Sequence, residues 1–236
     1  MTAPGPAMIR IEGLAKAFTL HNQGGVHLPV LADVGLTVHR GECVVLTGAS
    51  GAGKSSLMRA IYGNYAASAG SIRVRHGDDW VDMAAAAPRM IIAVRRASLG
   101  YVSQFLRVIP RVPAIDVVAG PLLQAGVDTA EARARAATML ARLNLPERLW
   151  SLPPATFSGG EQQRVNIAHG FVRRYPILLL DEPTASLDAA NRHVVIELIG
   201  EARAAGAALV GIFHDADVRG AVATRTVDVE AFRPAA

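Results

Sequence analysis

The 236-residue sequence predicts an α/β fold: a mostly parallel sheet covered by helices, with antiparallel β-structure before it and an all-helical insertion within it. In the first forty residues, two stretches alternate apolar and polar side chains, which is typical of half-buried strands. From residue 43 onward, short apolar strands alternate with helical segments, an order typical of parallel sheets. Between about residues 112 and 150, helix-forming Ala, Leu and Arg dominate.

The first half of the chain contains most of the predicted strands. Ile9 and Ile11 lie between polar neighbours, and Val34, Leu36 and Val38 alternate with smaller or polar residues. A short apolar strand at 43–47 then runs into a glycine-rich turn. The further elements expected here are a helix at 55–62, a strand at 71–75, turns at 77–79, a helix at 89–97 and a strand at 99–102.

The second half begins with the helical insertion, which prolines interrupt. The elements expected after it are a helix at 161–173, a buried strand at 177–180, a helix at 189–204, a strand at 208–212, a short helix and a final strand at 226–229. We therefore predict one domain over 1–236. Its core comprises 1–104 plus 151–236, and a helical subdomain comprises 105–150.

Composition narrows the class of protein. Hydrophobic residues make up 51% and charged residues 19%, so the chain is globular rather than disordered. The apolar runs are far shorter than the roughly 18 residues of a membrane span, and no secretory signal is visible at the start. Cys43 is the only cysteine and cannot form an internal disulfide. We expect a cytoplasmic protein with no direct membrane insertion.

Residues 48–55 read Gly-Ala-Ser-Gly-Ala-Gly-Lys-Ser and fit the phosphate-loop pattern G-x-x-x-x-G-K-[ST]. A predicted strand precedes the loop and a predicted helix follows it, as the motif requires. Glycines let the backbone wrap so that its N–H groups point at phosphate oxygens. Lys54 would contact the β- and γ-phosphates, and Ser55 would offer its hydroxyl to Mg²⁺. Only Lys16 and Lys54 among the 24 basic residues are lysines, which also argues against a chance glycine turn.

Two acids follow the apolar strand 177–180. In open α/β sheets ligands bind beyond the carboxyl ends of the strands, and these acids lie there. We expect Asp181 to belong to the Mg²⁺ shell and Glu182 to orient and deprotonate an attacking water. The alternative, two solvated turn residues, does not explain their pairing with the phosphate loop.

A second helix start suited to anions is predicted at residues 156–164, which read Thr-Phe-Ser-Gly-Gly-Glu-Gln-Gln-Arg. Ser158 with Glu161 three residues later is a capping box, which is sufficient as a structural explanation. Ser-Gly-Gly at a helix start is also an anion-binding cup. Two cups for one nucleotide predict a head-to-tail dimer in which each ATP lies between the phosphate loop of one subunit and the Ser-Gly-Gly helix of the other.

With these motifs in this order, nearly the whole chain resembles the ATP-binding-cassette (ABC) ATPases, a family of phosphate-loop NTPases. The resemblance implies catalytic roles for Glu182, His214, Gln104 and Lys54. It implies ATP contacts from Phe18, Gly48, Ala49, Ser50, Gly51, Ala52, Gly53, Lys54, Ser55 and Ser56. It implies metal contacts from Ser55, Gln104 and Asp181, and contacts to the partner subunit's ATP from Ser158, Gly159, Gly160, Glu161 and Asp188.

Three of these positions carry over from short motifs. Phe18, in Leu-Ala-Lys-Ala-Phe, matches the aromatic residue that stacks on adenine, although an ordinary core phenylalanine explains it too. Gln104 matches the glutamine that contacts Mg²⁺ and senses a partner. His214 follows a buried strand and matches the switch histidine at the γ-phosphate. Glu161 stands where many family members have Gln, and His169 where Arg is common, which leaves one local salt bridge in doubt.

Within the family, several stretches resemble the L-subunit ATP-binding protein of the bacterial carbon–phosphorus lyase system. These are 73–77 with Trp80, 105–111, 155–157, and 211–215 with 218–219. This resemblance implies an ATPase partnered with lyase subunits in phosphonate breakdown, in the early step that joins an alkylphosphonate to the ribose of a nucleoside triphosphate. The alternatives are the detached ATPase of a membrane transporter, a non-hydrolysing nucleotide-gated scaffold and a DNA-associated cassette. The last is disfavoured because the basic charge is local, so no direct nucleic-acid contact is expected.

The segment Met83–Ile115 holds five arginines and no acid. Because it surrounds Gln104, one hypothesis makes it a docking face for acidic partner surfaces, with Arg107 and Arg111 as the test positions. A solvated arginine-rich face is the equal alternative. The histidines form no ligand-like cluster, so no zinc site is predicted.

Overall fold

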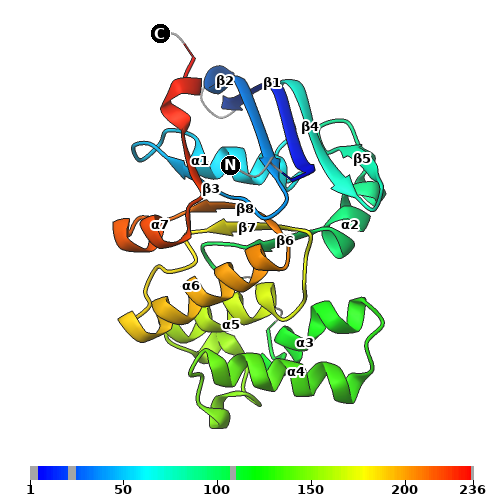
Figure 1. The fold of residues 1–236 in the computed structure, drawn as a ribbon, viewed down its shortest axis with the longest axis vertical. Coiled ribbons are helices and arrows are strands. Elements are labelled where there is room, and N and C mark those ends of the chain that lie inside the picture. Colours follow the sequence, from blue (N-terminus) through cyan, green and yellow to red (C-terminus); the bar gives the residue numbers. More distant parts are fainter. Residues whose placement is uncertain (1–4, 21–24, 107–109, 235–236) are drawn as a thin grey trace.

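The computed structural model describes residues 5–20, 25–106 and 110–234. At its centre is a five-stranded parallel sheet in the order β6-β7-β8-β3-β9 (Figure 1). Its strands are β3 (Cys43–Thr47), β6 (Leu99–Val102), β7 (Ile177–Asp181), β8 (Ala208–Ile212) and β9 (Arg225–Asp228). The predicted parallel sheet is confirmed, and β6 and β8 have the predicted bounds.

The central strands are apolar on both sides because both faces of the sheet are covered. In β7, Ile177 and Leu179 belong to one hydrophobic core, while Leu178 and Leu180 belong to the other. All four are at most 2% exposed. Burying each such side chain contributes about 1.5–3 kcal/mol. The strand is therefore firmly held, and the residues that follow it have a well-defined starting point.

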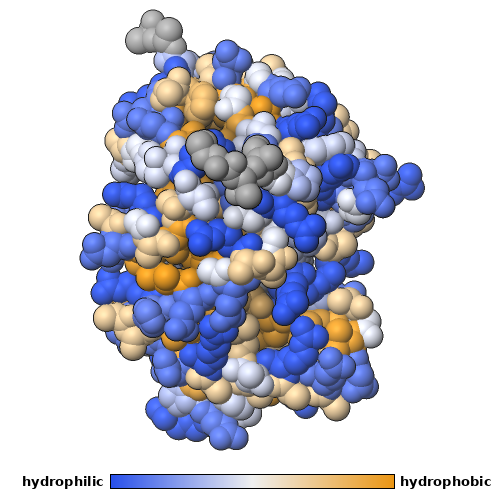
Figure 2. Space-filling view, viewed as in Figure 1, coloured by the Kyte–Doolittle hydropathy of each residue, from blue (hydrophilic) through white to orange (hydrophobic). Residues whose placement is uncertain are grey.

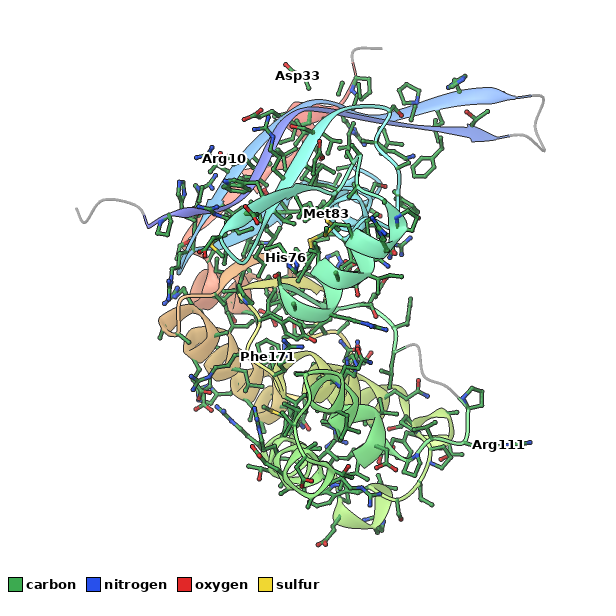
Figure 3. The ribbon with its side chains drawn as sticks, turned by 90° about the vertical axis from the view of Figure 1, so that its right-hand side faces the viewer. Arg10, Asp33, His76, Met83, Arg111 and Phe171 are labelled. Atoms are coloured by element: carbon green, nitrogen blue, oxygen red, sulfur yellow. The ribbon has the colours of Figure 1, made fainter. Side chains whose placement is uncertain are left out.

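A second, antiparallel sheet has the order β2-β1-β4-β5 and lies above the parallel one in Figure 1. It comprises β1 (Ala7–Leu20), β2 (Val26–His39), β4 (Ala69–His76) and β5 (Asp79–Asp82). The inward side chains of β1, β2 and β4 share a core with one face of the parallel sheet, and Met83 belongs to the same core (Figure 3). The sequence predicted only turns around 77–79. In the structure only residues 77 and 78 form the turn, and the chain then pairs with β4 as the strand β5.

Helices cover the parallel sheet from both sides. The helices α1 (Lys54–Ile61) and α2 (Pro88–Ala97) share the core of the antiparallel sheet. The helices α5 (Gly159–Phe171), α6 (Ala189–Ala204) and α7 (Ala216–Val222) contribute to the opposite core. Helix α5 begins two residues earlier than predicted, because the cap at Ser158 includes both glycines in the first turn.

The predicted helical insertion is present as α3 (Ala114–Gln124) and α4 (Thr129–Arg142), followed by two short 3₁₀ turns, η2 (Glu147–Leu149) and η3 (Pro154–Thr156). Asp128 caps α4 by accepting hydrogen bonds from the N–H groups of Ala130 and Glu131. Both helices pack on α5 at the bottom of the molecule in Figure 1. A final 3₁₀ turn, η4 (Val229–Phe232), follows β9.

The space-filling view in Figure 2 shows a surface of mixed polarity. No helix in the described part of the chain is long and apolar enough to span a bilayer.

Candidate functional site

The phosphate-loop residues 48–53 form the turn between β3 and α1, and Lys54, Ser55 and Ser56 begin the helix. Gly48, Gly51 and Gly53 all have positive φ, a backbone conformation that is strained for residues with a side chain. A Cβ atom on Gly53 would lie 2.9 Å from a methyl carbon of Leu31 in β2. The loop therefore adopts a conformation that glycine permits, and it packs against the antiparallel sheet too closely for a side chain at residue 53.

The first turn of α1 has N–H groups with no side-chain cap, because Gly53 occupies the N-cap position. These donors carry the positive end of the helix dipole, which suits an anion. The Nζ atom of Lys54 folds back over the loop and donates to the carbonyl oxygens of Gly48 and Ala49, at 2.7 and 2.8 Å. An ammonium group therefore lies on the loop, next to the uncapped N–H groups of the first turn of α1.

Asp181 lies at the end of β7 and is only 1% exposed. Its carboxylate accepts a hydrogen bond from the Ser55 hydroxyl at 3.3 Å and from the Tyr101 hydroxyl at 2.9 Å. Burial raises the pKa of Asp181, and the hydrogen bonds from Tyr101 and Ser55 act in the opposite direction. Two oxygen donors, Asp181 and Ser55, therefore converge beside the phosphate loop, as a hard cation such as Mg²⁺ requires.

Glu182 is the meeting point of three strands. Val102 at the end of β6 is paired with Leu180 of β7, and Asp181 of β7 is paired with Ile212 at the end of β8. The residues that follow the carboxyl ends of these three strands therefore lie close together. The Gln104 amide donates to the Glu182 carboxylate at 3.1 Å, and His214 Nε2 lies 2.6 Å from the other carboxylate oxygen.

The backbone of Glu182 also has an unusual conformation. Its φ is 53°, a conformation that costs non-glycine residues of order 1–3 kcal/mol. Its N–H donates to the Ile212 carbonyl at 3.1 Å. The backbone hydrogen bond to Ile212 and the side-chain contacts with Gln104 and His214 together hold the Glu182 carboxylate in one position.

Ser158 begins α5 in the predicted capping box. Its hydroxyl donates to the Glu161 carboxylate at 2.7 Å, its own N–H donates to the same oxygen at 2.8 Å, and the Glu161 N–H is 3.4 Å from the hydroxyl. These hydrogen bonds lower the pKa of Glu161. A Cβ on Gly160 would lie 3.0 Å from the Ser186 carbonyl, so a residue larger than glycine would crowd this turn.

Asp188 caps α6 in the same manner, accepting from the N–H and the side-chain amide of Asn191 at 2.8 and 3.0 Å. Within the described ranges, no hydrogen bond joins Ser158, Gly159, Gly160, Glu161 or Asp188 to residues 48–56. The structure thus brings together Lys54, Ser55, Gln104, Asp181, Glu182 and His214 around the loop. It leaves the Ser158 and Asp188 set as a separate surface.

Phe18 lies on β1, where its half-buried ring packs edge-on against Tyr65, with the centroids 5.2 Å apart. The Lys16 ammonium lies 4.6 Å from the Phe18 centroid. The aromatic ring has a cation on one side and is not an interior core residue, so the ordinary-core alternative does not describe it.

Sequence reasoning missed two members of this site. Tyr101 had no signal beyond its place before Gln104 at the end of β6, yet it hydrogen-bonds Asp181. Glu230 in η4 accepts from the Ala49 N–H at 2.5 Å, although 181 residues separate them. Parallel pairing of β9 with β3 brings η4 to the loop, and only the strand order could have indicated it.

The basic segment is not uniformly available to a partner. Arg95 donates to the Tyr62 carbonyl and to Asn64, both at 2.8 Å, and its guanidinium lies 4.3 Å from the Tyr62 centroid. Arg95 is therefore engaged in the fold, whereas Arg89 is exposed. Arg107 lies outside the described residues. His169, the noted departure, has its pKa lowered by burial.

A family model described as "ABC transporter" matches residues 31–185. The chain belongs to the ABC transporter family. It is 37% identical over 222 residues to the lipoprotein-releasing system ATP-binding protein LolD of Bordetella pertussis, covering 92% of each chain. It is 35% identical to the macrolide export ATP-binding/permease protein MacB of Sodalis glossinidius, covering 91% of this chain and 31% of that protein.

Solved structures agree with this membership. The dimeric structure of MJ0796, a bacterial ABC transporter cassette, has a TM-score of 0.84 at 27% identity and covers 94% of this chain and 95% of that one. A post-hydrolysis dimer of MJ0796 bound to ADP and Pi has a TM-score of 0.85 at 27% identity, covering 96% and 94%. The predicted ABC cassette fold is confirmed. This ABC ATPase binds ATP, and Mg²⁺ is expected to bind together with it.

Proposed function

We propose that this chain is the ATP-hydrolysing subunit of a membrane ABC transporter of the lipoprotein-release or macrolide-export type. The observation that carries this proposal is the 37% identity to LolD across nearly the full length of both chains. The relatives described above are transporter ATPases, so the comparisons support the transporter alternative better than the carbon–phosphorus lyase interpretation. The chain would act at the membrane through a permease that is a separate protein.

The residues around the loop suit a magnesium–triphosphate ligand. Ser55 and Asp181 would hold Mg²⁺, with Gln104 reaching the same shell, since all three supply oxygen atoms. The metal would neutralise charge on the β- and γ-phosphates. Lys54 would leave its two carbonyl acceptors and pair with phosphate, while the loop amides and the first turn of α1 cradle the remaining oxygens.

Glu182 would act as the base that orients and deprotonates the attacking water. Its carboxylate is 18% exposed and has hydrogen-bond partners at both oxygens, which supports a fixed orientation. His214 is 68% exposed on its side chain and would contact the γ-phosphate. Gln104 links this carboxylate to β6, so displacement of Gln104 by a partner would disturb the water position.

The Ser158 set would serve a second protomer. Ser158, Gly159, Gly160, Glu161 and Asp188 form a helix-end surface separate from the loop of their own chain. In a head-to-tail dimer this surface would close over the partner's ATP, and Phe18 would stack on the adenine of its own subunit. The dimeric cassette MJ0796, at 27% identity, supports this arrangement.

We also propose the division into a nucleotide-binding core, 1–104 plus 151–236, and a helical subdomain at 105–150. The mutual packing of α3 and α4 supports it.

Co-purification tests the transporter proposal. A tagged chain isolated from detergent-solubilised cells should bring down an integral membrane protein. Retrieval of soluble phosphonate-lyase subunits instead, with no membrane protein, would reject the proposal in favour of the lyase interpretation. ATP turnover in the purified complex tests hydrolysis, and its complete absence with the partner present would favour a nucleotide-gated scaffold.

A further inference from the structure

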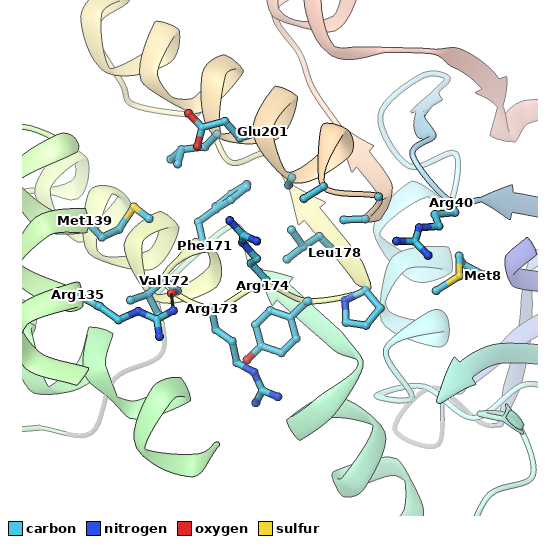
Figure 4. Close-up of a pocket in the computed structure, with 17 residues that line it drawn as sticks. Met8, Arg40, Arg135, Met139, Phe171, Val172, Arg173, Arg174, Leu178 and Glu201 are labelled. Carbon is cyan, nitrogen blue, oxygen red and sulfur yellow. Dashed lines mark hydrogen bonds between the residues drawn. The ribbon is translucent and has the colours of Figure 1, made fainter. Parts of the chain in front are cut away.

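A cavity of about 520 Å³ lies at the amino ends of β7 and β8, at the edge of the parallel sheet opposite the phosphate loop (Figure 4). Tyr175 and Pro176 precede β7, Ala207 precedes β8, and Arg40 comes shortly before β3. The nucleotide site occupies the other end of these strands. This volume is within the range of small-molecule pockets, roughly 300–1,000 Å³.

Four arginines and one acid line the cavity: Arg40, Arg135, Arg173, Arg174 and Glu201. In Figure 4, Arg40 and Arg135 reach the cavity from separate parts of the chain, and the consecutive Arg173 and Arg174 reach it from the segment before β7. The acid is already neutralised, because Glu201 accepts two hydrogen bonds from Arg142 at 2.6 and 2.8 Å. The cavity therefore has a strong positive excess.

Two of the arginines have local partners that fix their positions. Arg135 donates to the Val172 carbonyl at 3.3 Å and lies 3.6 Å from Glu131. Arg173 donates to the Arg96 carbonyl and lies 5.2 Å from the Tyr175 centroid. Arg135 and Arg173 therefore contribute positive charge at the rim of the cavity, while their guanidinium groups already have hydrogen-bond partners within the protein.

The other two, Arg40 and Arg174, donate no side-chain hydrogen bond within the described part of the chain. Arg40 packs flat over Gly206, where a Cβ atom would lie 2.5 Å from the guanidinium. Gly206 has a φ of 91°, so glycine suits both its backbone and this contact. Two guanidinium groups with unused donors at one cavity are well matched to the oxygens of a phosphate.

The floor of the cavity is apolar. Leu178 and Leu198 are 2% and 3% exposed, and the rings of Phe171 and Tyr175 lie beside them. The two leucines are already out of water, whereas the rings of Phe171 and Tyr175 are only half-buried. An apolar group attached to an anion would cover the exposed part of these two rings, which is favourable.

We propose that this cavity binds a small organic phosphate. Its phosphate pairs with Arg40 and Arg174, and its apolar or aromatic body lies on the half-buried rings of Phe171 and Tyr175. The site is separate from the nucleotide site and does not depend on the function proposed above.

Phenyl phosphate is the test ligand, titrated calorimetrically in phosphate-free buffer into the full-length chain saturated with Mg–ADP, so that the phosphate loop is already occupied. The wild type is expected to bind one equivalent, and Arg40→Ala with Arg174→Ala should weaken binding roughly tenfold or more, because hydrogen bonds to charged groups are the strong ones. The matched control is Arg89→Ala with Arg148→Ala, which removes the same charge from exposed positions elsewhere. It should bind as the wild type does.

A second variant keeps all the arginines. Ala205 lines the cavity yet is exposed, so Ala205→Trp should fill the space and abolish binding without unfolding the chain. Unfolding midpoints check that each variant is folded. The Lys54→Ala variant should keep phenyl phosphate binding, which separates this site from the nucleotide site.

Four results would overturn the proposal. They are no saturable binding to the wild type, unchanged affinity in the Arg40/Arg174 variant, equal loss in the Arg89/Arg148 control, and equal affinity for inorganic phosphate or phenol.

Discussion

The phosphate-loop half of the proposed ATP site is held together by contacts between distant segments, whereas the Ser158 half consists mainly of contacts within a few residues. Ser55 reaches Asp181 across 126 positions, and Gln104 reaches Glu182 across 78. Ser158 and Glu161, by contrast, are three residues apart. The first half is assembled by the sheet for chemistry, and the second is a preformed helix end that faces outward.

Replacing Glu182 by Gln should have the largest effect and tests the chemical half. The amide keeps the shape but cannot accept the proton of water, so ATP turnover should fall by roughly 10²–10⁴-fold while ATP still binds. Phosphate release and nucleotide titration measure the two properties. Glu197→Gln on α6 is the matched control, and equal turnover in Glu182→Gln and the wild type would remove Glu182 from the mechanism.

Replacing Lys54 by Ala should weaken nucleotide binding by roughly 10- to 100-fold, since one charge-assisted contact to phosphate is lost. Equilibrium titration with a fluorescent ATP analogue measures this. Arg133→Ala, exposed on α4 in the helical insertion, should leave the affinity unchanged. An affinity unchanged in Lys54→Ala as well would mean that the ammonium stays on the loop carbonyls when nucleotide binds.

Replacing Ser158 by Asp separates capping from anion binding in the other half. The variant is made in a Glu161→Gln background, because the Ser158 hydroxyl contacts the Glu161 carboxylate at 2.7 Å and two carboxylates there would repel. In that background aspartate is as good an N-cap as serine, so the unfolding midpoint should stay near the background value. Its negative charge would repel the partner's phosphate, so ATP-dependent dimerisation should weaken by about tenfold when measured by light scattering in a Glu182→Gln background. Unchanged dimerisation would mean that this helix end does not meet the nucleotide.

Glu161 offers the smallest effect and the one that depends on pH. Because the Ser158 hydroxyl and N–H stabilise the ionised carboxylate, its folded pKa is lowered. Its contribution to stability is therefore present above the ordinary pKa and is lost as pH falls through the lowered value. Glu161→Gln should remove that part of the acid dependence in thermal melts between about pH 3 and 6, and Glu131→Gln should not. If the melting temperature depended on pH in the same way in Glu161→Gln and in Glu131→Gln, this acid dependence would belong to a group other than Glu161.

Many features of both halves were open to prediction because their signals are local. Glycine is favoured at positive φ, four apolar residues in a row mark a strand buried on both faces, and Ser followed three residues later by Glu marks a helix start. The strands β6 and β8 and the helix α6 were therefore placed at their observed bounds. The strand β5 was missed because Asp79–Asp82 has too few apolar residues to differ from the preceding turn.

The amino-acid sequence alone determined the family, the phosphate loop, the capping box and the order of the elements, since each depends on neighbours within a few residues. Only the tertiary structure decided that Tyr101 supports Asp181, that Glu230 reaches the loop, and that Arg40 and Arg174 line one cavity. The physical reason is that strand order and register set these contacts. Pairing of β3 with both β8 and β9 joins segments more than 160 residues apart, and no local pattern encodes such a distance.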